Sequence, residues 1–208
     1  METSYAPSFE IQQPGMDDAP RLWTQYRTPI VAGILIVAIG ALAWASMHLR
    51  SSLREGQART ELSNAPLAQK KLEIAKHYLG TQTAALALLE VAESQIKSPT
   101  PAAAMDTYRL FLENYPKHSL RNAALLGLGT AAEASSKKDE AIQAYQRAIQ
   151  PPTDTYSALA LLSLARIQKQ QGDEAGSRQS LQQCASQFAS LTYGKQAREQ
   201  LLAPQPQP

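Results

Sequence analysis

An unbroken run of apolar residues stands near the start of the chain. It covers residues 29–47, reads PIVAGILIVAIGALAWASM and contains no charge. As an α-helix rising 1.5 Å per residue it is about 28 Å long, close to the ~30 Å hydrocarbon core of a bilayer. Trp23 and Tyr26 before the run, and Trp44 near its end, are residue types that favour the membrane interfaces. The pattern predicts a transmembrane helix over residues 29–49.

Two other interpretations of this run are a cleaved signal peptide and the buried core helix of a soluble protein. A signal peptide has a shorter apolar segment close to the first residue, whereas about 28 mostly polar residues come first here. The A-x-A spacings near its end, Ala41-Leu42-Ala43 and Ala43-Trp44-Ala45, lie within the apolar run itself and do not end it as a cleavage site would. Both interpretations are therefore disfavoured relative to a membrane anchor.

Small residues lie close together on the expected membrane helix. Gly33 and Gly40 are two turns apart on one face, and Ala41 and Ala45 form a small-xxx-small pair nearby. Small side chains let the backbones of two membrane helices approach closely. Pairing within the bilayer is therefore one hypothesis for these four positions.

Beyond the run, helical periodicity is interrupted at regular intervals. Thr81, Ser119 and Asp154 or Thr155 each precede an apolar-periodic stretch, as N-cap residues do. The interruptions also contain proline, in Thr100-Pro101, Asn114-Tyr115-Pro116 and Gln150-Pro151-Pro152. This pattern predicts helices of ~13–17 residues joined by short turns, an array of helical hairpins.

The expected hairpins repeat. Their first helices contain LALLEVA, LLGLGTA and LALLSLA, whose equivalent residues Leu88, Leu125 and Leu161 recur after 37 and then 36 residues. Their second helices share a small residue, a larger one four positions later and another three positions after that. These sets are Ala104, Tyr108 and Phe111; Ala141, Tyr145 and Ala148; and Ser177, Leu181 and Cys184. Such spacing forms one stripe on a helix, in which the small residue admits a neighbouring helix.

These residues resemble the tetratricopeptide-repeat family over residues 81–203. The middle repeat matches best, through Leu125, Leu128, Gly129, Asp139, Glu140, Ala141, Tyr145 and Ala148. The first repeat departs from the pattern because Pro99 and Pro101 stand where the family usually has glycine. The resemblance implies an all-α fold: an α-solenoid of about three helical hairpins, ended by a capping helix at residues 193–202.

The order of the parts gives a second resemblance. The expected parts are a disordered tail (1–28), a transmembrane helix (29–49), a juxtamembrane helical stalk (50–80), the repeat domain (81–203) and a polar tail (204–208). This order is similar to that of the YfgM-like ancillary subunits of the SecYEG translocon, bacterial inner-membrane proteins whose repeats contact the translocon and chaperones. The resemblance implies a cytoplasmic N-terminus and periplasmic repeats. The arginines flanking the run do not decide the orientation.

Leucines on the first helices of the hairpins point in more directions than one buried stripe requires. Some of them should line the concave side of the solenoid, where tetratricopeptide repeats usually bind proteins. The candidate partner-binding residues are Leu86, Leu89, Glu93, Leu126, Thr130, Glu133, Leu159, Leu162, Arg166 and Lys169. The alternative is that residues 66–79 cover these leucines with a stripe of Leu67, Leu72, Ala75 and Leu79.

Composition and charge disfavour several classes of function. The net charge of +2 gives no nucleic-acid footprint, so no nucleic-acid partner is expected. The three histidines are not spaced as metal ligands, no Gly-rich phosphate loop occurs, and Cys184 is the only cysteine. Asp139-Glu140 and Asp173-Glu174 each open a second helix, where acidic residues meet the positive end of the helix dipole. We therefore expect no cofactor and no metal, and an enzyme is disfavoured.

The sequence thus predicts a membrane-anchored protein-interaction scaffold that assists protein secretion or a periplasmic chaperone network. Its expected partners are other proteins and the lipid bilayer. One alternative is a subunit of an envelope or cell-division complex that binds one fixed partner. Another is a structural anchor that self-associates as a homo-oligomer through its membrane helix and stalk.

Overall fold

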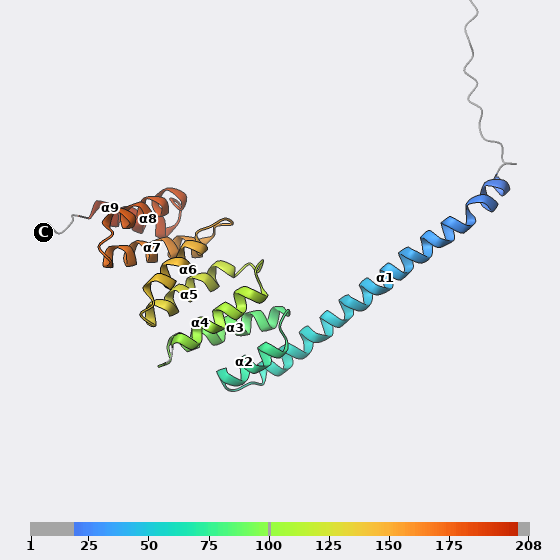
Figure 1. Cartoon of the computed structure of the whole chain (residues 1–208), viewed down its shortest axis with the longest axis horizontal. Helices are drawn as coiled ribbons and strands as arrows, with labels where there is room; N and C mark the ends of the chain where they lie inside the picture. The colour runs from blue at the N-terminus through green and yellow to red at the C-terminus, as the bar shows by residue number, and fades with distance from the viewer. Residues whose placement is uncertain (1–18, 100, 204–208) are drawn as a thin grey trace, which may run out of the picture. The chain divides into compact units, whose positions relative to one another are not determined.

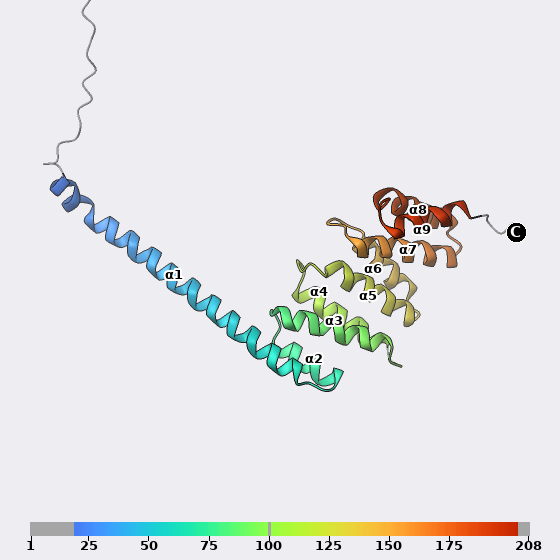
Figure 2. The ribbon, with the colours of Figure 1, turned by 180° about the vertical axis from the view of Figure 1, so that it is seen from behind.

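The computed structural model describes residues 19–99 and 101–203, and all regular structure within them is α-helical. The helices are α1 (Ala19–Ser63), α2 (Ala68–His77), α3 (Gln82–Ile96), α4 (Pro101–Asn114), α5 (Arg121–Ala134), α6 (Lys138–Ala148), α7 (Thr155–Gln170), α8 (Glu174–Gln187) and α9 (Thr192–Leu202). Figure 1 and Figure 2 show α3 to α9 stacked in sequence order. The predicted all-α fold class is confirmed.

The chain divides into two compact units, Met1–Ser52 and Leu53–Pro208. Helix α1 is the only regular element in the described part of the first unit. The stretch Val31–Ser63 contains a window with a mean hydropathy of 1.9, and none of that window is buried. The chain therefore has one long, exposed, apolar helix near its N-terminus, with the length and composition of a membrane span.

Helix α1 begins earlier than the sequence predicts. The expected disordered tail covers residues 1–28, but residues 19–28 are already helical, and residues 1–18 lie outside the described part. Pro20 falls in the first turn, where the missing N–H of proline breaks no hydrogen bond. The helix was missed because these residues have no apolar period. The expected polar tail over residues 204–208 also lies outside the described part.

The expected separate stalk over residues 50–80 is not what the structure shows. Residues 53–63 of α1 continue into α2 through a short turn, and both belong to the same compact unit as the repeats. Ala58 and Leu62 are buried in one core with Ala75 and Tyr78 of this hairpin. The hydroxyl of Tyr78 donates a hydrogen bond of 2.7 Å to Glu61. Small and apolar residues one turn apart in α1 make this packing possible, so the stalk region supplies an additional hairpin.

Glu55 fixes this additional hairpin to the first helix of the next one. Its carboxylate accepts hydrogen bonds of 2.9 Å from the backbone N–H groups of Gln82 and Thr83, and a third from the Thr83 hydroxyl. It therefore caps the N-terminus of α3 from another helix. Burial opposes the charge on Glu55, but the hydrogen bonds from Thr83 and Gln82 outweigh it and lower the pKa of the carboxyl.

Two of the predicted N-caps are confirmed. The Thr81 side chain accepts a hydrogen bond of 3.2 Å from the Ala84 N–H and caps α3. Asp154 accepts one of 3.0 Å from the Ser157 N–H and caps α7 in a capping box. Both residues satisfy backbone donors that the first helical turn leaves unpaired.

The prediction that Ser119 is an N-cap is wrong. Helix α5 begins at Arg121, and Leu120 takes the cap position without a side-chain hydrogen bond. His118 accepts the backbone hydrogen bonds at this turn instead. Its Nδ1 accepts a hydrogen bond of 3.0 Å from the Leu120 N–H, and its carbonyl accepts one of 3.0 Å from the Arg121 N–H. Thr100, which precedes Pro101 in one of the interruptions, lies outside the described residues.

Helices α3 to α8 form the three predicted hairpins. Each first helix (α3, α5, α7) packs against its own second helix (α4, α6, α8), and each second helix packs against the next first helix. The first helices also contact one another in turn, α3 with α5, α5 with α7 and α7 with α9. Helix α9 closes the array at the predicted place.

The buried core is divided into two clusters that meet along α7. Ala160, Leu164 and Ile167 of α7 belong to the larger cluster, which extends back to α1. The smaller cluster joins α7, α8 and α9 through residues on another face of α7. Ile149 packs against both clusters.

Candidate protein-binding surface

The candidate residues lie on the first helices α3, α5 and α7, along one side of the array. Their leucines are half-buried, except for Leu86, which is 54% exposed. Their polar residues are exposed, except for Glu133, which is half-buried. The candidate residues therefore combine half-buried leucines with accessible polar groups on the first helices.

The structure brings Glu133 and Arg166 together. The guanidinium Nη2 of Arg166 in α7 lies 2.7 Å from Oε1 of Glu133 in α5. The same carboxylate oxygen accepts a hydrogen bond of 2.5 Å from the hydroxyl of Tyr145 in α6. The hydrogen bond that Arg166 donates to Glu133 raises the pKa of Arg166 above its usual value. Three helices therefore meet at one carboxylate on this side of the array.

Two tyrosines from the second helices fill the gaps between successive first helices. A Cβ added to Gly127 of α5 would lie 2.3 Å from the ring of Tyr108 in α4, and one added to Gly129 would lie 2.3 Å from the ring of Tyr145. Burial, followed by the nearby charge of Glu93, raises the pKa of Tyr108 to about 12. Tyr108 thus lies between α3 and α5, and the glycines in α5 make room for both rings.

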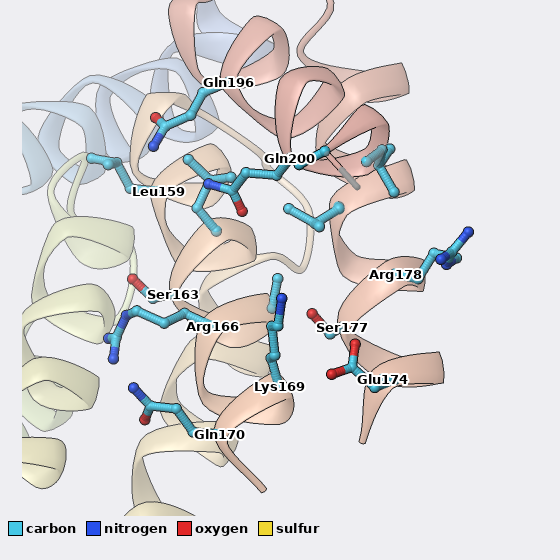
Figure 3. A pocket seen from close by; sticks show the side chains of 15 residues that line it. Leu159, Ser163, Arg166, Lys169, Gln170, Glu174, Ser177, Arg178, Gln196 and Gln200 are labelled. Carbon is cyan, nitrogen blue, oxygen red and sulfur yellow. The ribbon is translucent and has the colours of Figure 1, made fainter. Parts of the chain in front are cut away.

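The third repeat has Leu181 at the position of Tyr108 and Tyr145. A groove of about 660 Å³ opens there between α7, α8 and α9. Figure 3 shows Gln196 and Gln200 on the opposite side of this groove from Lys169. The groove is lined by Leu159, Leu162, Ser163, Ala165, Arg166, Lys169, Gln170, Glu174, Ser177, Arg178, Leu181, Gln196, Gln200, Leu201 and Ala203.

The wall formed by α9 is polar where earlier first helices are apolar. Ala160 and Leu164 of α7 are buried against the preceding hairpin. The residues one repeat later, Gln196 and Gln200, are exposed and line the groove. A short leucine in place of tyrosine, together with these glutamines, leaves the space between α7 and α9 unfilled.

The candidates at the other end of the array do not join this groove. Leu86 is exposed on α3, and Glu93 forms an ion pair of 3.9 Å with Lys97 one turn away. Helix α2 does not cover Leu86. It packs against α3 as the later second helices pack against α5 and α7, with Lys71 2.5 Å from Glu90.

The groove also contains residues outside the candidate set predicted from the sequence, among them Leu181, Gln196, Gln200 and Leu201. The sequence does contain a signal for the groove: when the second helices are aligned, Leu181 falls at the position that Tyr108 and Tyr145 occupy in the first two repeats. Continuing the repeat interval into α9 likewise places Gln196 and Gln200 at apolar positions of α7.

The small residues of the apolar helix are exposed. Gly33, Gly40, Ala41 and Ala45 all face outward from α1. A Cβ added to either glycine would meet nothing within 4 Å. These positions are therefore accessible to another helix, and their role in pairing stays a hypothesis.

The adjacent carboxylates at the starts of second helices have structural partners. Glu140 in the first turn of α6 pairs with Lys137 at 3.2 Å and also with Arg109 of α4. Asp173 caps α8 by accepting a hydrogen bond of 2.8 Å from the Gly176 N–H. Among the described residues, no group of three or more His, Cys, Asp or Glu side chains could hold a metal ion.

The family comparison agrees with this architecture. The tetratricopeptide-repeat family matches residues 123–150 and 159–190, which cover most of the α5–α6 and α7–α8 hairpins. No curated protein matches the chain. The C-terminal half of the chain therefore carries tetratricopeptide repeats.

Proposed function

We propose that the chain is a membrane-anchored scaffold that binds another protein on the side formed by α3, α5 and α7. Tetratricopeptide repeats suggest protein partners, and the long apolar helix suggests attachment to a membrane. The observation that carries the proposal is the presence of both features in one chain. Its role is to hold a partner near the bilayer, with no catalytic step and no cofactor.

The apolar helix serves as an anchor in this proposal, and a cleaved leader is the competing interpretation. Helix α1 continues without a break from its apolar stretch into residues that are buried in the repeat unit, such as Ala58 and Leu62. About 28 mostly polar residues precede the apolar stretch, whereas a cleaved leader has its apolar segment close to the first residue. The span in this proposal is residues 29–49.

The finer proposal places the chain in a bacterial inner membrane, with the N-terminus in the cytoplasm and the repeats in the periplasm. It rests on the similarity in the order of parts to YfgM-like translocon subunits. In that setting the partner is the translocon or a periplasmic chaperone. The two rival roles are a subunit with one fixed partner in an envelope or cell-division complex, and an anchor that pairs with itself through the small residues of α1.

Photocrosslinking in native membranes tests the proposal and separates the rivals. A photoreactive amino acid is placed at Leu86, at Leu162, and, as a control, at Leu67, which precedes α2. Leu67 is 67% exposed and lies outside the first helices. We expect adducts from Leu86 and Leu162, with translocon or chaperone proteins, and none from Leu67.

The identity of the adducts decides between the alternatives. A single stoichiometric partner from another complex would favour the fixed-partner role. Adducts only with other copies of the chain would favour the self-associating anchor. Equal labelling from Leu67 and the two test positions would contradict binding on this side of the array.

A further inference from the structure

We propose that the groove between α7 and α9 binds an acidic segment of a partner protein and takes up a leucine-sized side chain of that segment beside Leu181. This inference rests on the proposed scaffold function and adds the place and the chemistry of recognition. Three observations carry it: the unfilled space, the charges at its rim and the amides on its α9 wall.

The space is one that the same chain fills elsewhere. Tyr108 closes the gap between α3 and α5 with its ring against Gly127, and Tyr145 closes the gap beside α5 in the next repeat. Leu181 is buried at the matching position but ends short of the gap. The resulting groove of about 660 Å³ is within the size range of ligand sites, and an apolar side chain entering it would replace the missing ring.

The charges at the groove favour a negatively charged partner. Lys169 and Arg178 line it, and neither has an ion-pair partner within the described part of the chain. Arg166 adds a third cation, although it is already paired with Glu133. Glu174 is the only acidic residue that lines the groove. A partner with carboxylates on both sides of its leucine matches this excess of positive charge.

The amides make the groove suitable for an extended peptide. Gln196 and Gln200 are exposed on α9, and each offers a donor and an acceptor to a backbone passing between them and α7. Figure 3 shows both side chains directed from α9 toward the groove. The apolar floor selects the side chain, the cations select the flanking charge, and the amides bind the backbone.

The test is a fluorescence polarisation titration of the full chain in detergent micelles. The probe is a labelled peptide of sequence Ser-Asp-Leu-Glu-Asp-Leu-Ser. One control peptide carries lysine in place of each acidic residue, and a second carries serine in place of each leucine. We expect the acidic leucine peptide to bind at least tenfold more tightly than either control. Equal affinity for all three peptides would overturn the proposal.

Variants locate the site. Leu181→Tyr should refill the space. Ala165 in α7 corresponds to Ala92 in α3, so the new ring would have the same small neighbour in its own first helix that Tyr108 has. It should lower the affinity at least tenfold without changing the helix content.

The double variant K169E/R178E should also lose binding. The charge-matched control K138E/R147E changes exposed residues of α6 outside the groove and should bind normally. Unchanged binding by Leu181→Tyr would overturn the proposal.

Two other occupants are distinguished in the same assay. If a chain ending at Ala203 bound the peptide and the full chain did not, residues 204–208 would be the occupant and the proposal would be wrong. It would also be wrong if Leu181→Tyr converted a dimer into a monomer. Crosslinks from Leu86 and Leu162 in membranes without peptide selectivity would overturn only this inference and leave the scaffold function standing.

Discussion

The hydroxyl of Tyr145 and the carboxylate of Glu133 are joined by a hydrogen bond of 2.5 Å, and the same oxygen of Glu133 pairs with Arg166. Tyr145 belongs to a second helix, whereas Glu133 and Arg166 belong to successive first helices. Burial and the bond to Glu133 raise the pKa of the tyrosine well above its usual value, so the hydroxyl stays a donor at physiological pH. This contact connects two neighbouring repeats.

Replacing Tyr145 separates the contribution of its ring from that of its hydroxyl. The side chain is 1% exposed, so Tyr145→Ala should lower the free energy of unfolding by about 3 kcal/mol or more. Tyr145→Phe keeps the ring and should lower it by only about 1 kcal/mol. Urea unfolding of the full chain in detergent measures both values. Equal losses for the two variants would contradict the packing role of the ring.

The close contact between Gly127 of α5 and the ring of Tyr108 should be sensitive to any added side chain. Gly127→Val places a Cβ within 2.3 Å of the Tyr108 ring, so the ring has to move, at a cost of about 1–3 kcal/mol. Gly56→Ala is the control, because a Cβ at Gly56 meets nothing within 4 Å. Thermal unfolding should show a lower melting temperature for the first variant only. A normal melting temperature for Gly127→Val would place Tyr108 elsewhere.

Glu55 should make the stability of the repeat unit depend on pH. Its pKa is lowered in the folded chain, so its contribution is present above the pKa of the unfolded chain, ordinarily about 4.3 for glutamate. That contribution is lost as the pH falls through the folded-state pKa. Glu55→Gln should lower the melting temperature at pH 7, by roughly the effect of losing a helix cap.

The difference between wild type and Glu55→Gln should then shrink as the pH falls below about 4, because the wild-type carboxylate becomes protonated as well. Melting curves of both chains across this pH range measure the effect. Glu73→Gln, an exposed residue of α2 that caps no helix, is the control. A difference that stays constant down to low pH would mean that the charge of Glu55 is not what stabilises α3.

The apolar stretch of α1 should keep the chain in the membrane during an alkaline carbonate wash. Replacing Ile36 and Ile39 with lysine should release it, because each lysine near the centre of a span costs about 2.5–3.5 kcal/mol on insertion. The same replacements at Leu49 and Leu53 near the end of the apolar run should have little effect. Wild-type chain in the washed supernatant would contradict membrane anchoring.

A reporter that is active only in the periplasm tests the orientation. Fused after Pro208, it should be active, since the proposed topology places the repeats outside the cytoplasm. Activity of a cytoplasmic reporter at the same position would contradict that topology and the translocon-like role. The scaffold function would then apply to the other side of the membrane.

Replacing the exposed Leu86 and the half-buried Leu162 tests the binding surface directly. Leu86→Glu together with Leu162→Glu should abolish recovery of a crosslinked partner, because a carboxylate buried in the complex without a counter-charge is costly. Leu67→Glu, just before α2, should leave recovery unchanged. Circular dichroism checks that all variants are folded. Normal recovery with the double variant would move the partner to another face.

Hairpins and caps were predictable because local chemistry determines them. Thr81 and Asp154 satisfy donors at most three residues away, and the small–large spacing around Tyr145 depends on one helix alone. Ser119 does not cap α5 because His118 accepts the hydrogen bonds of the Leu120 and Arg121 N–H groups. The sequence offers Ser119 and His118 as neighbouring acceptors and does not show which of them takes these bonds.

Contacts between distant segments could not be predicted in this way. A second cap on α3, beside Thr81, comes from Glu55, and the groove depends on which side chain from α8 faces α9. The candidate site was therefore only partly anticipated: the leucines and cations of α7 were selected, but the opposite wall was not. Sequence periodicity identifies the exposed side of a helix without identifying what lies across from it.

The division of the core along α7 leaves α8 and α9 packed in a smaller apolar cluster than the rest of the array. In a repeat array each element is stabilised by its neighbours, and Ile149 is among the few side chains that bridge the two clusters. Helices α8 and α9 can therefore open while α7 remains held by α5 and α6. A ligand in the groove would oppose this opening, so its occupancy would be recorded as slower amide exchange in α8 and α9.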